Sequence, residues 1–144
     1  MPRYRKCFVC GAENPCGLQG QFFWNEEERV ILYKFSPREH HVGWPGRVHG
    51  GVIAAALDEA MGWAVYQEAG VWFYTWELRV RYARPVEPGA ELLVRARYKG
   101  ARRAYHEGQA ELVDENGEVY ARAWGKYVPI PEEEFKAMAP EMEL

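Results

Sequence analysis

The residue whose type and setting best suit catalysis is Asp58. The chain contains 21 acidic residues, of which only Asp58 and Asp114 are aspartates, and between Val52 and Tyr66 only Asp58 and Glu59 carry charge. Burying a carboxylate raises its pKa or costs free energy, and perturbed groups of this kind concentrate in active sites. We therefore predict Asp58 as a catalytic carboxylate. The alternative is that it pairs with a buried arginine or caps a neighbouring group.

A second candidate stands just before this uncharged stretch, where the chain reads His49-Gly50-Gly51. If a helix begins here, its first N–H groups have no partner within the helix and lie at the positive end of the helix dipole. Such donors suit the negative charge that develops on oxygen during acyl transfer. The alternative is an ordinary loop-to-helix entry, in which glycine supplies backbone freedom.

Hydroxyl side chains are scarce. The single serine, Ser36, has no Gly-x-Ser-x-Gly around it, which excludes a nucleophile-elbow serine hydrolase. The single threonine, Thr75, lies in a strand-like stretch whose alternation places it with Glu77 and not with Leu78, which should face the helix. A β-bulge, or a site at the margin of the sheet, would be needed to turn Thr75 towards Asp58.

Three cysteines near the amino terminus raise the question of a metal site. Cys7-x-x-Cys10 with Cys16 has the spacing of half a zinc site, but a fourth ligand would have to come from His40 or His41. The alternative is that the cysteines are small residues of a tucked amino-terminal segment, and their odd number argues against a disulfide framework. We expect no bound metal and no cofactor.

The elements that must position these residues follow from periodicity and turn signals. Residues 1–17 look irregular, being dense in Gly, Pro and Cys, whereas Gly51 to about Glu68 is rich in Ala and Leu and free of Pro, which predicts a long buried helix. Asn116-Gly117 between two alternating stretches indicates a hairpin. Strands are expected over residues 18–24, 29–35, 71–86, 90–99, 104–113 and 118–128, followed by a tail or short helix within 131–144.

Two strands, one buried helix and four further strands in a meander predict an α+β fold. An antiparallel sheet of about six strands wrapped around the helix is the economical packing. With 144 residues and 48% hydrophobic content, the chain can form one domain over 1–144. A net charge of -3 argues against general nucleic-acid binding, and no apolar run suits a membrane span or a signal peptide. We therefore expect a soluble, cytoplasmic protein.

Three stretches carry a resemblance to one family. The chain is similar to the PaaI-like hot-dog-fold acyl-CoA thioesterases, whose His-Gly-Gly signature is followed nine residues later by an acidic residue. The resemblance covers nearly the whole chain. The stretches that carry it are PGRVHGGVIAAALD at 45–58, TWELRVRYARPVEPG at 75–89, and CFVCG at 7–11 with Asn14-Pro15 and Gly17-Leu18.

The resemblance implies a hot-dog fold, an acyl-CoA substrate and a role for each matching position. Asp58 would be the nucleophile or the base that activates water. The Gly50 N–H would polarise the thioester oxygen, with His49 orienting this substrate-binding turn, to which Gly51 also belongs. Thr75 occupies the place where relatives often carry a supporting hydroxyl.

A basic cluster gives a further expectation. Arg102 and Arg103 stand at a turn close to other basic residues, a pattern that is usually a solvated sheet face. Because arginine suits phosphate geometrically, we expect these two to contact the phosphates of CoA. Single-stranded nucleic acid on aromatics and arginines is a competing interpretation. A non-catalytic acyl-CoA-binding protein and a hot-dog hydratase or dehydratase are the functions that compete with hydrolysis.

The spacing of the site residues predicts a homo-oligomer, either a dimer or a dimer of dimers. Gly50 and Asp58 are eight residues apart, which is roughly 12 Å along a helix at about 1.5 Å per residue. One helix cannot place both groups on the same carbonyl. Two antiparallel helices related by a two-fold axis would bring Gly50 of one chain to Asp58 of the other.

Overall fold

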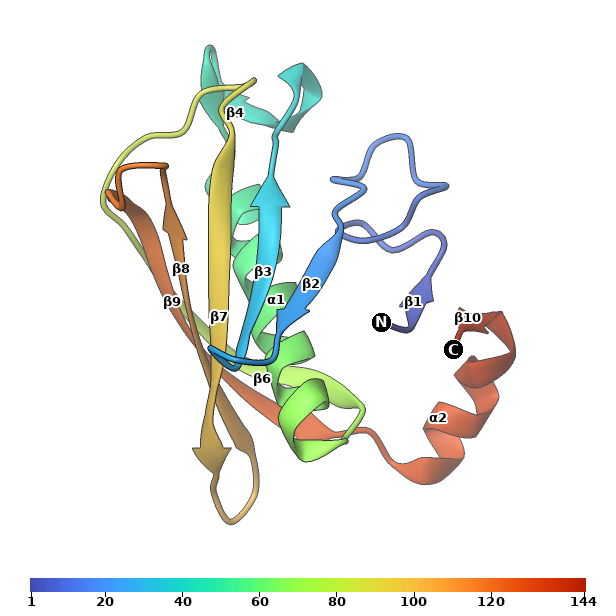
Figure 1. Ribbon diagram of the computed structural model, residues 1–144. Coiled ribbons are helices and arrows are strands. Elements are labelled where there is room, and N and C mark those ends of the chain that lie inside the picture. Colours follow the sequence, from blue (N-terminus) through green and yellow to red (C-terminus); the bar gives the residue numbers. More distant parts are fainter.

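The computed structural model describes residues 1–144. Its main sheet has six antiparallel strands in the order β2-β3-β7-β8-β9-β6, and the long helix α1 lies against one face of it (Figure 1). The expected hot-dog arrangement is therefore confirmed. The main elements are β2 Phe22–Asn25, β3 Val30–Phe35, α1 Gly50–Ala69, β6 Phe73–Tyr82, β7 Leu92–Ala101, β8 His106–Val113 and β9 Val119–Pro129.

Shorter elements flank this core. Two small two-stranded sheets and three short helices account for the remaining regular structure. These are β1 Arg3–Tyr4 paired with β10 Met142–Glu143, β4 Val42–Trp44 paired with β5 Arg47–Val48, and the helices η1 Glu39–His41, α2 Glu132–Met138 and η2 Ala139–Glu141. The β1–β10 pair brings the two ends of the chain together beside α2 (Figure 1).

Helix α1 forms as its sequence predicts and is buried along most of its length. It contains no proline, and it ends at Gly70, whose φ of 68° is left-handed and whose N–H donates to the Tyr66 carbonyl over 2.8 Å. It packs against β3, β6, β7, β8 and β9, and its apolar side chains form the hydrophobic core with those on the inner face of the sheet. No helix in the chain combines the length and apolar character that a membrane span requires.

The strand order differs from the expected four-strand meander. Strands β7, β8 and β9 do form a meander, but β6 pairs with β9 at the far edge of the sheet and not with β7. Residues 83–91, which join β6 to β7, contain Pro85 and Pro88 and are too long for a tight hairpin. They instead run past the ends of the intervening strands (Figure 1).

The amino-terminal segment also differs from expectation. Residues 18–21 are not the start of a strand but pair locally: the Leu18 N–H donates to the Phe8 carbonyl and the Gly20 N–H to the Val9 carbonyl, both over 2.7 Å. Val9 and Leu18 are buried and join the hydrophobic core. Backbone hydrogen bonds therefore fold the segment on itself, and Val9 and Leu18 pack it against the core.

Candidate functional site

Asp58 lies where α1, β6 and β9 meet. The Thr75 hydroxyl on β6 is 3.1 Å from Oδ1 and 3.0 Å from Oδ2, and the Tyr127 hydroxyl on β9 donates to Oδ1 over 2.9 Å. The Tyr127 hydroxyl also lies 3.1 Å from the Asp58 carbonyl oxygen. One carboxylate thus receives hydrogen bonds from two strands, which fixes its orientation.

The environment of Asp58 changes its acidity. Burial raises the pKa of the Asp58 carboxyl above its ordinary value, while the hydrogen bonds from Tyr127 and Thr75 act in the opposite direction. Burial, helped by the negative charge of Asp58, raises the pKa of Tyr127 as well, so this hydroxyl stays protonated and remains a donor. A carboxylate with a raised pKa is a stronger base than an exposed aspartate.

A β-bulge turns Thr75 towards the helix. Along β6 and β9, Thr75 pairs with Tyr127 and Glu77 pairs with Lys126, so Trp76 is an extra residue without a partner. The extra residue shifts the alternation by one, which puts Thr75 on the inner face and leaves Trp76 59% exposed. Of the two explanations that the sequence left open, a bulge or a site at the margin of the sheet, the structure shows the bulge.

His49 organises the first turn of α1. As the N-cap residue it accepts the Gly51 N–H on ring Nδ1 over 2.8 Å, and its carbonyl accepts the N–H groups of Val52 and Ile53. The Gly50 N–H donates no hydrogen bond to His49, and the Gly50 carbonyl accepts one from the Tyr82 hydroxyl over 2.6 Å. The Gly51 N–H already donates to His49 and is therefore not available to a substrate, so Gly51 contributes to the site only by its lack of a side chain.

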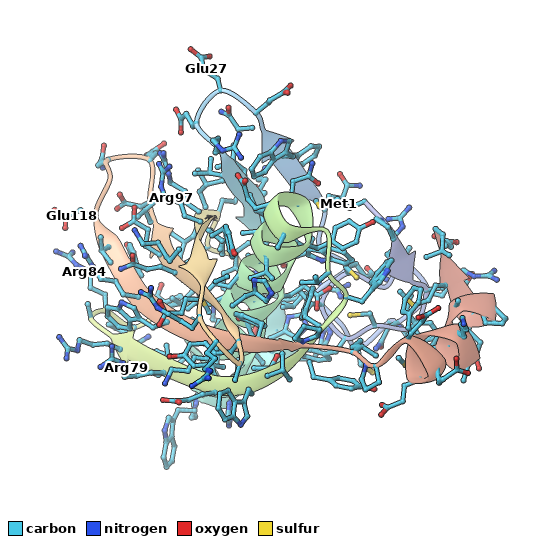
Figure 2. The ribbon with its side chains drawn as sticks, turned by 90° about the horizontal axis from the view of Figure 1, so that it is seen from below. Met1, Glu27, Arg79, Arg84, Arg97 and Glu118 are labelled. Carbon is cyan, nitrogen blue, oxygen red and sulfur yellow. The ribbon has the colours of Figure 1, made fainter.

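Arg102 and Arg103 lie apart from this turn. They are exposed in the β7–β8 hairpin, at the end of the sheet where α1 finishes (Figure 1), and Arg102 is 3.0 Å from Glu107. Tyr105 of the same hairpin lies 5.4 Å from Trp76, ring centre to ring centre. Other arginines, such as Arg79 and Arg84, project from the side of the sheet away from α1 (Figure 2).

A second cluster of reactive groups includes Glu59, the residue that follows Asp58 in α1. The sulfurs of Cys7 and Cys10 and the carboxylate of Glu59 have ligand atoms within 4.8 Å of one another. His41, one of the two histidines that could have supplied a further ligand, is engaged elsewhere: it accepts the Arg38 N–H on Nδ1, and its Nε2 faces the Cys16 carbonyl. Burial raises the pKa of Glu59 to about 7.

Two residues of these clusters escaped sequence reasoning. Tyr127 is one of nine tyrosines, and the sequence indicated only that its side chain should face the helix from the last strand. Glu59 could be recognised as a charged residue in a buried helix, but nothing in the sequence linked it to Cys7, 52 positions earlier. Both depend on pairings between distant segments.

Known protein families include relatives of this chain. A family model described as the thioesterase superfamily matches residues 45–121. The acyl-coenzyme A thioesterase THEM4 of Rattus norvegicus is 33% identical over 79 residues, which cover 55% of this chain and 34% of the rat protein. The chain thus spans about a third of the length of this curated relative.

Two solved structures share the fold. Protein RHA08564, described as a thioesterase superfamily protein, has a TM-score of 0.78 at 24% identity, covering 86% of this chain and 63% of that one. The PaaI protein of E. coli, from the phenylacetic acid degradation operon, has a TM-score of 0.68 at 16% identity, covering 79% of this chain and 81% of that one.

Proposed function

Because the chain belongs to the thioesterase superfamily, we propose that it hydrolyses an acyl-CoA thioester to the free acid and CoA. The observation that carries this proposal is the Asp58 carboxylate, half-buried in α1 and oriented by Thr75 and Tyr127. Glu59, the next residue of the same helix, is bonded to Cys7 and Trp63 and not to hydroxyls of the sheet.

Asp58 acts on the carbonyl carbon of the thioester. As nucleophile it forms a mixed anhydride that water then hydrolyses; as base it takes a proton from the attacking water. In both cases the carbon–sulfur bond breaks and CoA leaves as the thiolate. The Gly50 N–H, at the positive end of α1, stabilises the negative charge that develops on the thioester oxygen.

Two observations support CoA as the thiol part of the substrate. One is the positive charge of two exposed arginines, and the other is the similarity to the rat protein, whose name gives acyl-coenzyme A as its substrate. Arg102 and Arg103 are free to bind phosphate at the β7–β8 turn, because both are exposed and only Arg102 has a carboxylate partner. A protein of this kind would act in the cytoplasm, where acyl-CoA is available, without a metal or redox cofactor in the reaction.

Asp58→Asn tests the proposal directly. Asparagine keeps the shape and loses the charge, so kcat is expected to fall about 10²–10⁴-fold while the fold and the affinity for CoA stay nearly unchanged. Release of CoA from a panel of acyl-CoAs, followed with a thiol reagent, measures kcat; circular dichroism and CoA binding are the controls.

Each other outcome of this assay is informative. An Asp58→Asn variant as fast as the wild type would show that Asp58 is not the catalytic group. A wild-type protein that binds acyl-CoA and releases no CoA from any of the panel would be a non-catalytic binding protein. Products of water addition to an unsaturated acyl group would identify a hydratase.

A further inference from the structure

Although the sequence alone predicts no bound metal, we propose that Cys7, Cys10 and Glu59 form a binding site for one zinc ion, which ties the amino-terminal segment to α1. The Cys7 sulfur lies 3.7 Å and 3.8 Å from the two oxygens of Glu59. In a tetrahedral site with Zn–S of about 2.3 Å and Zn–O of about 2.0 Å, sulfur and oxygen are roughly 3.5 Å apart. Cys7 and Glu59 are therefore already close to the required spacing, and the ligand atom of Cys10 lies within 4.8 Å of both.

The turn that carries the two cysteines is shaped for a sulfur ligand. The N–H groups of Val9 and Cys10 point at the Cys7 sulfur over 3.3 Å and 3.5 Å, and such donors stabilise a thiolate. Gly11 closes the turn by donating to the Cys7 carbonyl, and a Cβ at this position would come within 2.4 Å of that same oxygen. The turn is thus fixed by the backbone and not by chance side-chain packing.

Glu59 presents a carboxylate that lacks a positive partner. Its hydrogen bonds are to the Cys7 thiol and to the Trp63 indole N–H, which is 3.2 Å from Oε1, and none of the ion pairs of the chain includes it. Around it lies an apolar cavity of about 300 Å³, lined by Trp63, Trp72 and Phe73 among others. A carboxylate in such surroundings needs a compensating charge, and a divalent cation supplies it.

The donor set selects the metal. Two thiolates and one carboxylate suit zinc, whereas magnesium and calcium prefer oxygen throughout and copper(I) prefers soft donors throughout. The Trp63 indole has the role of an outer partner that orients a ligating carboxylate. A water molecule on the cavity side completes the tetrahedron.

The ion has a structural role. Successive residues of a helix point about 100° apart, so Glu59 faces the amino-terminal segment while Asp58 faces Thr75 and Tyr127. Zinc would not touch the reacting carbonyl. It would hold residues 7–10 against the turn of α1 that carries Asp58.

The test uses the whole protein, freed of metal and kept reduced with a non-thiol reductant. Titration with Co²⁺ is followed by the charge-transfer absorption of thiolate-bound cobalt, and bound zinc is then counted by elemental analysis after gel filtration. Thermal unfolding is measured with and without zinc. The variants are Cys7→Ser and Glu59→Gln, and the matched control is Cys16→Ser, because Cys16 is exposed and outside the cluster.

We expect the wild type and Cys16→Ser to bind one equivalent, show the thiolate–cobalt band, and unfold at a higher temperature with zinc, because an ion that binds only the folded state stabilises it. Cys7→Ser should lose the band and the zinc-induced stabilisation. Glu59→Gln keeps both thiols and should bind zinc at least about tenfold more weakly.

Two results would overturn the proposal. One is a folded, reduced wild type that takes up no zinc or cobalt, in which case Cys7 and Glu59 form only a hydrogen-bonded clip. The other is a full equivalent retained by both Cys7→Ser and Glu59→Gln, which would place the ion elsewhere. Should Cys7→Ser fail to fold, Glu59→Gln and the metal-free wild type still decide between these results.

Discussion

At the residue scale, two opposing influences act on the Asp58 carboxylate. Burial favours its neutral form, and the hydroxyls of Tyr127 and Thr75 favour its charged form; burial is the larger influence, so the pKa is raised. The hydrogen bonds hold the carboxylate in one orientation, and the burial keeps it basic. Removing one hydroxyl should therefore shift its titration without removing the group itself.

Thr75→Val is expected to move the acid limb of the pH profile of kcat/KM to higher pH. Valine keeps the shape of threonine but loses the hydroxyl that contacts both carboxylate oxygens, so the neutral form of Asp58 gains relative stability and its pKa rises further. In the proposed mechanism the charged form of Asp58 is the active one, so activity is lost as the pH falls through this pKa, and in the variant the loss begins at higher pH. Initial rates of CoA release across pH measure the limb.

Two further variants make this result specific. Tyr127→Phe removes the other donor and should shift the limb in the same direction. Tyr74 is next to Thr75 in β6, and its hydroxyl donates to Glu134. Tyr74→Phe removes this hydroxyl and should leave the limb in place. A limb that stays fixed in both Thr75→Val and Tyr127→Phe, or moves to lower pH, would show that it does not report Asp58.

At the element scale, the bulge in β6 decides which side chain faces Asp58. With Trp76 present as an extra residue, Thr75 and Leu78 share the inner face although they are three positions apart. If the same residues alternated without a bulge, Thr75 would face outward together with Glu77. The site therefore depends on the register of the strand as much as on its residue types.

Deletion of Trp76 is expected to close the bulge and leave the acid limb of kcat/KM in place. Thr75 and Glu77 would then be consecutive and would keep their partners Tyr127 and Lys126, so Thr75 should still face Asp58. Trp76→Ala keeps the residue count and the bulge, and should leave the limb unchanged. It should cost less than about 1.5 kcal/mol of stability, the scale of one aromatic pair, since Trp76 contacts Tyr105 but is largely exposed.

Combining the Trp76 deletion with Thr75→Val shows whether Thr75 still contacts Asp58 after the deletion. Because Thr75 keeps its contact with Asp58 after the deletion, adding Thr75→Val should move the limb as far as it does in the full-length chain. No shift in the double variant, with both proteins folded by circular dichroism, would mean that the deletion has turned Thr75 away from Asp58 and that this account of the bulge is wrong.

Local patterns predicted much of the fold. The helix over Gly51 to about Glu68 was clear because it is free of proline and apolar on nearly every side, and the hairpin at Asn116-Gly117 joins β8 to β9 as expected. The family resemblance carried by residues 45–58 is confirmed by the family match over 45–121. These features are local, so periodicity and turn residues contain them.

Long-range pairings were not predictable in the same way. The placement of β6 beside β9 and the pairing of β1 with β10 join segments far apart in sequence, and no periodicity records such partners. The placement of Thr75 beside Tyr127, where both contact Asp58, follows from the first of these. Sequence reasoning therefore reached Asp58 and the bulge but missed one of the two hydroxyls that hold the carboxylate.

At the scale of the whole molecule, one chain separates two groups, Gly50 and Asp58, that the proposed reaction needs together. Gly50 is the first residue of α1 and Asp58 lies eight residues later, about 12 Å along the axis at about 1.5 Å per residue. An oxyanion donor must lie about 3 Å from the thioester oxygen, and the attacking carboxylate must reach the same carbonyl. A single chain does not meet both requirements.

The free edge of the sheet offers a way to supply the missing group. Strand β6 is the last strand of the sheet, and its ten residues leave Trp76 and Tyr82 exposed. We propose that two chains associate across a two-fold axis next to this edge, with their α1 helices antiparallel, so that each active site takes Asp58 from one chain and Gly50 from its partner.

The last prediction is that two inactive variants restore activity when mixed. Asp58→Asn lacks the carboxylate, and Gly50→Pro lacks the N–H donor. Proline suits this position because Gly50 is the first helical residue and His49 before it is extended, with φ -61° and ψ 133°. Gly50→Ala is the matched control, since its Cβ would meet Tyr82 at an ordinary 3.4 Å and its N–H remains, so it should stay active.

After exchange of subunits, a heterodimer of the two variants holds one site with both defects and one with none. A 1:1 mixture in which half of the dimers are mixed should therefore regain roughly a quarter of the wild-type activity, because two-fold symmetry gives two sites per dimer. Differently tagged chains, copurified as heterodimers, show that exchange has occurred. If those heterodimers are inactive while Gly50→Ala is active, or if the native enzyme proves to be a fully active monomer, then each chain builds its own site and Gly50 is not the donor that acts with the Asp58 of a partner.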